Sequence, residues 1–139
     1  ADMVSPIADI HFDLHEIPLE ENSFDVIFCN HVLEHVEDDN QCMKELYRVM
    51  KKGGWGIFQV PIDYNNKETY EDPNITDPKE REIHFWQKDH LRLYGLDYPK
   101  KLEKVGFKIN IFDPKKSFKN FDYEKLRLNP SELIYIASK

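Results

Sequence analysis

Residues 31–35 (HVLEH) place two histidines and a glutamate close together. The spacing H-x-x-E-H occurs in zinc enzymes in which the histidines bind the metal and the glutamate acts as a base, with all three side chains on one helix. Here His31 comes two residues after an apolar run, residues 25–29, and a helix is expected only from about Asp38. A zinc hydrolase is therefore a remote alternative, no metal site is predicted, and Glu34 is expected to be a solvated or capping acid.

The elements around this stretch alternate between strand and helix. The run 25–29 (DVIFC) is rich in β-branched and aromatic residues and predicts a buried parallel strand. Asp38 and Asp39 can cap a following helix, which cations and a glycine at residues 51–53 (KKG) are expected to close. Residues 55–61 (WGIFQVP) then predict a second strand. Strand, helix and strand in this order form one right-handed βαβ unit of a doubly wound α/β sheet.

More elements are expected on either side of this unit. Residues 10–14 (IHFDL) predict a short strand, and residues 96–107 (LDYPKKLEKVGF) predict a helix with a proline in its first turn and a glycine just past its end. Strands are expected at residues 107–112 and 133–137. Residues 62–94 are polar, aromatic and interrupted by prolines, and they are too long for an ordinary connection. We expect them to form a lid or a substrate-binding insertion.

Composition limits the classes of protein that fit. A chain of 139 residues with 40% apolar and 32% charged side chains is typical of one soluble globular domain. It holds no apolar run as long as a membrane span. The net charge of −7 argues against binding to duplex nucleic acid, which usually needs a basic face. Cys29 and Cys42 fit no C-x-x-C spacing, so reduced thiols and a cytoplasmic location are expected.

Residues 16–61 resemble the middle of a class I S-adenosylmethionine-dependent methyltransferase, of the methyltransferase type 11 or ubiquinone-biosynthesis-like group. The resemblance rests on the order and spacing of several short motifs: a loop at 18–23, SFD at 23–25, LEH at 33–35, ELYRV at 45–49 and KGG at 52–54. It implies a Rossmann-like α/β sheet with strand order 3-2-1-4-5-7-6 and an antiparallel last strand. On this mapping Asp2 ends strand two, Asp13 ends strand three, and residues 24–29 and 55–61 are strands four and five.

The resemblance also implies a function and its residues. The protein would transfer a methyl group from S-adenosylmethionine to an unidentified small-molecule or lipid-precursor acceptor. Asp2 would accept hydrogen bonds from the ribose hydroxyls, and Asp13 from the adenine amino group, with Leu14 packed on the ring. Asn30 and His31 would lie where the methyl group is presented.

Two sets of side chains are candidates for contact with the acceptor. A hydroxyl acceptor requires a base, and His31 or His35 suits this role because an imidazole titrates near operating pH. A local structural role for His35 remains equally open. A polar and aromatic group in the long segment could close over a substrate: His84, Trp86, His90, Arg92 and Tyr94. An interface, or a loop that packs its own aromatic rings, would account for this group equally well.

The sequence departs from the family pattern at its start. Members carry a glycine-rich loop after strand one, ahead of the acidic residue of strand two, and no glycine precedes Gly53 here. We therefore expect residues 1–139 to be a single, partial methyltransferase domain that lacks strand one, is inactive alone and fails to bind the cofactor measurably. Its uncovered strand-four edge would favour self-association. A non-catalytic interaction module with the same fold is the alternative.

Overall fold

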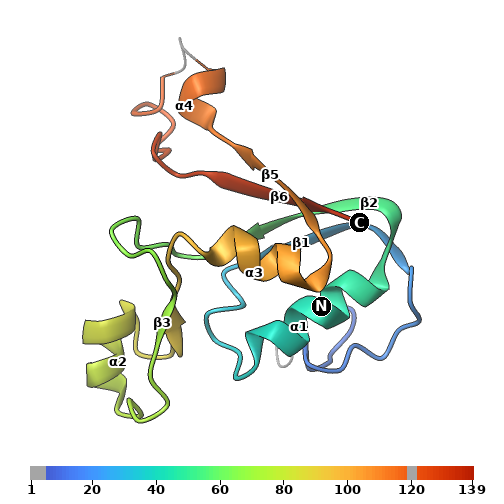
Figure 1. Ribbon diagram of the computed structural model, residues 1–139, viewed down its shortest axis with the longest axis horizontal. Helices are drawn as coiled ribbons and strands as arrows, with labels where there is room; N and C mark the ends of the chain where they lie inside the picture. The colour runs from blue at the N-terminus through green and yellow to red at the C-terminus, as the bar shows by residue number, and fades with distance from the viewer. Residues whose placement is uncertain (1–5, 119–121) are drawn as a thin grey trace.

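A four-stranded mixed sheet forms the centre of the computed structural model, which describes residues 6–118 and 122–139. Strands β1 (Phe24–Asn30) and β2 (Met50–Gln59) run parallel, and helix α1 (Asp39–Val49) joins them (Figure 1). The predicted strand, helix and strand are thus confirmed as one βαβ unit.

Two antiparallel pairings complete the sheet. Strand β6 (Ile134–Ser138) pairs with β2, and β5 (Lys108–Phe112) pairs with β6. The resulting order, β1-β2-β6-β5, reproduces strands four, five, seven and six of the order implied by the resemblance, with the last strand antiparallel to both neighbours. The predicted Rossmann-like α/β class is therefore confirmed for this part of the sheet.

Helix α1 begins as its sequence predicts and ends earlier. The Asp38 carboxylate caps it by accepting a hydrogen bond from the Gln41 amide at 2.9 Å. The helix ends at Val49, so residues 51–53 do not close it as expected. They belong to β2, because Met50 pairs with Phe24 while the next register partners are Trp55 and Val26. The intervening residues bulge out of the sheet, and Gly53 supplies the positive φ of 79° that this bulge needs.

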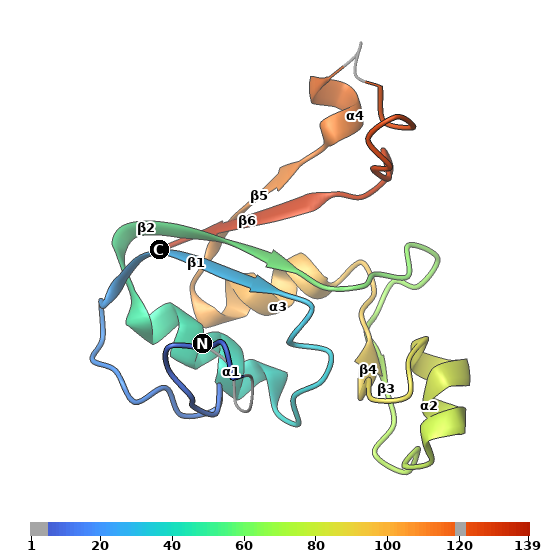
Figure 2. The same cartoon turned by 180° about the vertical axis from the view of Figure 1, so that it is seen from behind.

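Helix α3 (Tyr98–Val105) lies beside α1 on the same face of the sheet (Figures 1 and 2). The predicted proline stands in its first turn, and Gly106 ends it with φ of 123°. A Cβ at Gly106 would come within 2.9 Å of Cζ of Tyr47, so the site also needs glycine for close packing. The buried core lies between these two helices and the sheet, with Phe58, Tyr98 and Leu102 fully covered.

The long segment 62–94 contains its own small elements. Strands β3 (Tyr70–Glu71) and β4 (Arg92–Leu93) pair antiparallel, and helix α2 (Pro78–Phe85) connects them. This unit lies beyond the carboxyl ends of β1 and β2 (Figure 2). This position is compatible with the predicted lid or substrate-binding insertion, and that role stays a prediction.

One predicted strand is wrong. Residues 10–13 have no regular secondary structure and a turn begins at Leu14, because no strand among the described residues offers them a ladder of hydrogen bonds. Within residues 6–118 and 122–139, no helix has the length and apolar character needed to cross a membrane. A one-turn helix, α4 (Pro114–Ser117), follows β5.

Candidate functional site

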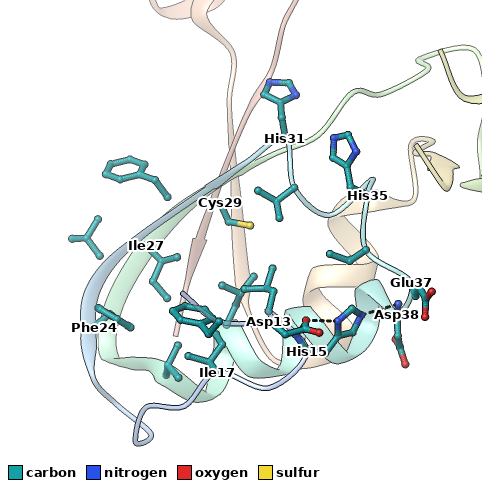
Figure 3. Close-up of a pocket in the computed structure, with 18 residues that line it drawn as sticks. Asp13, His15, Ile17, Phe24, Ile27, Cys29, His31, His35, Glu37 and Asp38 are labelled. Atoms are coloured by element: carbon teal, nitrogen blue, oxygen red, sulfur yellow. Dashed lines mark hydrogen bonds and ion pairs between the residues drawn. The ribbon is translucent and has the colours of Figure 1, made fainter. Parts of the chain in front are cut away.

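A cleft of about 1060 Å³ opens beside β1. Its apolar wall comes from β1 and α1, and the segment 12–17 and the loop 31–38 enclose it (Figure 3). Polar side chains on the wall include Asp13, His15, His31, His35, Glu37 and Asp38. The cleft reaches the carboxyl end of β1 and the N-terminus of α1, which is where open α/β sheets bind their ligands.

A hydrogen-bonded chain of three residues fixes one end of the cleft. Oδ1 of Asp13 accepts from the His15 amide at 2.9 Å and lies 2.6 Å from His15 Nδ1. The Asp38 amide donates to Nε2 of His15 at 3.1 Å, so the proton of a neutral His15 belongs on Nδ1. The backbone amide of His15, followed by its ring, lowers the pKa of Asp13 below 3.8. Asp13 is therefore an anion with Oδ2 available to a ligand.

A sharp turn after β1 shapes the other end. Oδ1 of Asn30 accepts from the Gln59 amide at 3.3 Å, and the His31 amide donates to the Gln59 carbonyl at 2.8 Å. His31 has φ of 56°, a left-handed conformation that is uncommon for a residue other than glycine. The turn leaves the His31 side chain 59% exposed beside the cleft. Among the proposed cofactor residues, Asp13, Leu14 and His31 line this cleft. Asn30 does not line it, and Asp2 lies outside the described residues.

Glu34 is buried, which corrects the prediction of a solvated or capping acid. Its side chain is 1% exposed, and neither carboxylate oxygen has a hydrogen-bond partner. Nδ1 of His31 and Nε2 of His35 lie 3.5 and 3.9 Å from its Oε1. The side chains of His31, Glu34 and His35 therefore lie close together, although residues 31–37 form a loop rather than a helix.

Arg92 holds this loop in place. Its guanidinium donates to the carbonyl oxygens of Leu33, Val36 and Glu37 and to the Glu71 carboxylate, while the side chain is only 4% exposed. Tyr94 is also buried, and its hydroxyl donates to Asp39 Oδ2 at 2.8 Å. The donors of Arg92 and Tyr94 are thus engaged within the protein.

The remaining members of the predicted substrate group separate in space. His84 lies on α2 and packs near Tyr70, and Trp86 at the end of α2 is 50% exposed. His90 is buried, with its ring edge-on to His35 at 4.7 Å between centroids. Neither His84 nor Trp86 lines the cleft. His90 thus contacts His35 on the cleft wall, and Arg92 contacts the backbone of Val36 and Glu37, which also line the cleft.

Sequence reasoning missed His15 and Asp38 as parts of the cleft. For His15 the signal was the D-x-H spacing at residues 13–15, which permits an aspartate to accept a hydrogen bond from the amide two positions on. Cys29 and Cys42 are free thiols, as the sequence predicted, and Cys29 is buried. Burial, with a smaller effect of Glu34, raises the Cys29 pKa to about 12, so the thiol stays protonated.

Comparisons with known proteins agree with this fold. Residues 3–58 match the family model described as a methyltransferase domain. The chain is 42% identical over 45 residues to demethylmenaquinone methyltransferase of Listeria welshimeri, covering 32% of this chain and 19% of that protein. It is 39% identical over 57 residues to a probable S-adenosylmethionine-dependent methyltransferase of Mycolicibacterium smegmatis, covering 40% and 22%. The matches thus span about a fifth of these curated relatives.

Solved structures extend the likeness to nearly the whole chain. A possible histamine N-methyltransferase of Thermotoga maritima matches with a TM-score of 0.55 and 18% identity over 94% of this chain and 63% of that one. A putative S-adenosylmethionine-dependent methyltransferase of Listeria monocytogenes matches with 0.55 and 20% identity over 98% and 71%. These structures show that the chain has the fold of class I methyltransferases, and the sequence match over residues 3–58 agrees with the resemblance.

Proposed function

We propose that this protein transfers a methyl group from S-adenosylmethionine to a small-molecule or lipid-precursor acceptor. The observation that carries the proposal is the position of the cleft. It lies beside β1, the strand that corresponds to family strand four, and reaches the carboxyl end of that strand. A ligand there meets the loop after β1 and the N-terminus of α1 together.

The cleft suits the adenosine half of the cofactor. Oδ2 of Asp13 can accept from an adenine amino group, because His15 engages only Oδ1. Leu14 and Phe12 on the same wall offer apolar contact to the ring. For the methionine half, the family uses a glycine-bearing turn between a strand and a helix, and no such turn occurs among the described residues. The fit therefore concerns the adenosine half and the methyl-bearing end near His31.

Methyl transfer requires mainly that the protein align the acceptor with the methyl group. The cofactor supplies an activated methyl group on a sulfonium, so the chain must orient the acceptor and, for a hydroxyl acceptor, remove its proton. Among the two proposed bases, His31 is the more exposed, at 59% against 33% for His35. We assign the base role to His31. His35 is held by its Nδ1, which lies 3.3 Å from the Asp89 carbonyl oxygen.

A non-catalytic interaction module is the second candidate. It would be favoured if the natural full-length protein also lacked a glycine-bearing strand-to-helix turn. One structure of similar fold, with a TM-score of 0.56 and 13% identity, is of a putative methyltransferase in complex with the Trm112 activator of Haloferax volcanii. The alignment covers 93% of this chain and 60% of the chain in that structure. Such a module would keep the cleft without binding the cofactor.

Photochemical labelling separates the two candidates. The natural full-length protein would be irradiated with radiolabelled S-adenosylmethionine, digested, and mapped by mass spectrometry. We expect label within residues 12–38, and unlabelled S-adenosylhomocysteine in excess should suppress it. Label that resists this competition, or that falls only on α2, would contradict the proposal.

A further inference from the structure

We propose that Glu34, His35 and His90 form a binding site for a divalent transition-metal ion, with Zn²⁺ the best match. One donor atom from each residue lies within 4.8 Å of the donors of the other two. The three residues come from two distant segments, the loop after β1 and the connection before β4. The site lies beside the cleft and is independent of the cofactor proposal.

The first argument is the state of the buried donors. Both carboxylate oxygens of Glu34 and Nε2 of His90 are buried without a hydrogen-bond partner, and each residue is 1% exposed. Burying a carboxylate without a partner is costly, because it loses its hydration and gains nothing in return. A single cation bound between Glu34, His35 and His90 would give these buried donors a partner. The ring nitrogens of His31 and His35 lie 3.5 and 3.9 Å from Oε1 of Glu34, too far or too poorly aligned to count as hydrogen bonds.

The second argument is the orientation of the two imidazoles. Nδ1 of His90 lies 2.7 Å from the carbonyl oxygen of Phe85, so it carries the proton and leaves the lone pair on Nε2. Nδ1 of His35 lies 3.3 Å from the Asp89 carbonyl and 3.5 Å from the Asp89 carboxylate. Its Nε2 then faces Oε1 of Glu34 at 3.9 Å. A hydrogen bond on one ring nitrogen and a free lone pair on the other is how metal-binding histidines are held.

The third argument is the spacing. Ligands of a tetrahedral zinc ion, at about 2.0–2.2 Å from the metal, lie roughly 3.3–3.6 Å from one another. Oε1 of Glu34 and Nε2 of His35 are 3.9 Å apart, so a shift of a few tenths of an ångström brings them to that separation. The Arg92 contacts hold the backbone of this loop and leave side-chain rotation to close the rest.

The donor set selects the type of metal. Two imidazole nitrogens and one carboxylate suit zinc and similar transition metals, whereas Mg²⁺ and Ca²⁺ prefer oxygen ligands throughout. Three protein ligands leave a fourth position, and Nδ1 of His31 lies 3.5 Å from Oε1 of Glu34 beside them. Water or an oxygen atom of a small molecule can occupy this position.

Metal titration of the purified, chelator-dialysed protein tests the site. Zn²⁺ affinity would be measured by competition with a coloured chelator, and Co²⁺ would report the coordination geometry by its visible absorption. We expect one equivalent of Zn²⁺ and a tetrahedral Co²⁺ spectrum, with Mg²⁺ unable to compete. Glu34→Gln and His90→Gln should each weaken Zn²⁺ binding by more than about 100-fold.

His84→Gln is the matched control, because it removes an imidazole of intermediate exposure that lies outside the site. It should leave Zn²⁺ affinity unchanged within about threefold. Glu34→Gln preserves the shape of the side chain, so circular dichroism of this variant separates loss of a ligand from loss of the fold. Two results would overturn the proposal: less than one equivalent bound by the wild type, or equal affinities in Glu34→Gln, His90→Gln and His84→Gln.

Discussion

Replacing Arg92 with methionine tests how the loop 31–38 is held. Arg92 is 4% exposed and donates to three backbone carbonyls of that loop and to Glu71. Methionine keeps the apolar stem and removes every donor, so the carbonyl oxygens lose a charged partner. A hydrogen bond from a charged group contributes about 1.5–3 kcal/mol, and such contributions from one side chain do not simply add.

The expected loss is about 3–4 kcal/mol of unfolding free energy. Breaking a buried ion pair costs about 3–5 kcal/mol, and we expect a value near the lower end of that range. The reason is that Glu71 is 52% exposed, so water can replace Arg92 as the partner of its carboxylate. Arg92→Lys keeps the charge but not the planar fork, so we expect a loss of about half as much. Urea denaturation followed by tryptophan fluorescence measures both values.

Arg81→Met provides the matched control. Arg81 is partly buried, and its guanidinium Nε donates one hydrogen bond, to the carbonyl oxygen of Ile75 at 3.1 Å. Its removal should cost no more than about 1 kcal/mol. If Arg92→Met and Arg81→Met unfold at free energies within about 1 kcal/mol of each other, the assignment of Arg92 as the anchor of the loop is incorrect.

Two further predictions concern the cleft and the open face of the sheet. Because its hydrogen bonds to His15 lower the pKa of Asp13 in the folded state, the link between Asp13 and His15 should be present above pH 3.8 and lost as pH falls through the lowered value. Carboxyl chemical shifts followed by NMR against pH would show this, and an Asp13 titration at or above 3.8 would contradict it. Phe28 is 63% exposed on β1, whose one strand partner in the described sheet is β2, so we expect self-association through this strand. Phe28→Arg should reduce the associated fraction in sedimentation velocity, whereas Ile83→Arg, at a 69% exposed position on α2, should not.

The elements that the sequence predicted well are those whose signals are local. The apolar run of β1, the Asp38 cap of α1, and the proline and glycine that bound α3 each act within a few residues. The start of β2 was missed because it depends on a bulge that only the pairing with β1 reveals. The strand at residues 10–14 was wrongly predicted because periodicity cannot tell whether a partner strand is present.

The candidate site was predicted less completely, for a physical reason. Burial of Glu34 depends on residues far along the chain: Arg92 contacts the Leu33 carbonyl across 59 positions of sequence. His90 reaches His35 through the same long-range packing. The spacing H-x-x-E-H suggested metal chemistry, and the expectation that these residues do not lie within a helix is correct. His90, the third member of the proposed metal site, could not be identified without the fold.

Cofactor binding at Asp13 is the most direct test of the account. The natural full-length protein would be titrated with S-adenosylhomocysteine by calorimetry, together with Asp13→Ala and the control Asp9→Ala, which removes an exposed carboxylate outside the cleft. We predict one binding site, a loss of about 1–3 kcal/mol of binding free energy in Asp13→Ala, and no change in Asp9→Ala. The absence of binding by the wild-type protein would contradict the methyltransferase proposal, and equal affinities in all three proteins would contradict the placement of the cofactor in this cleft.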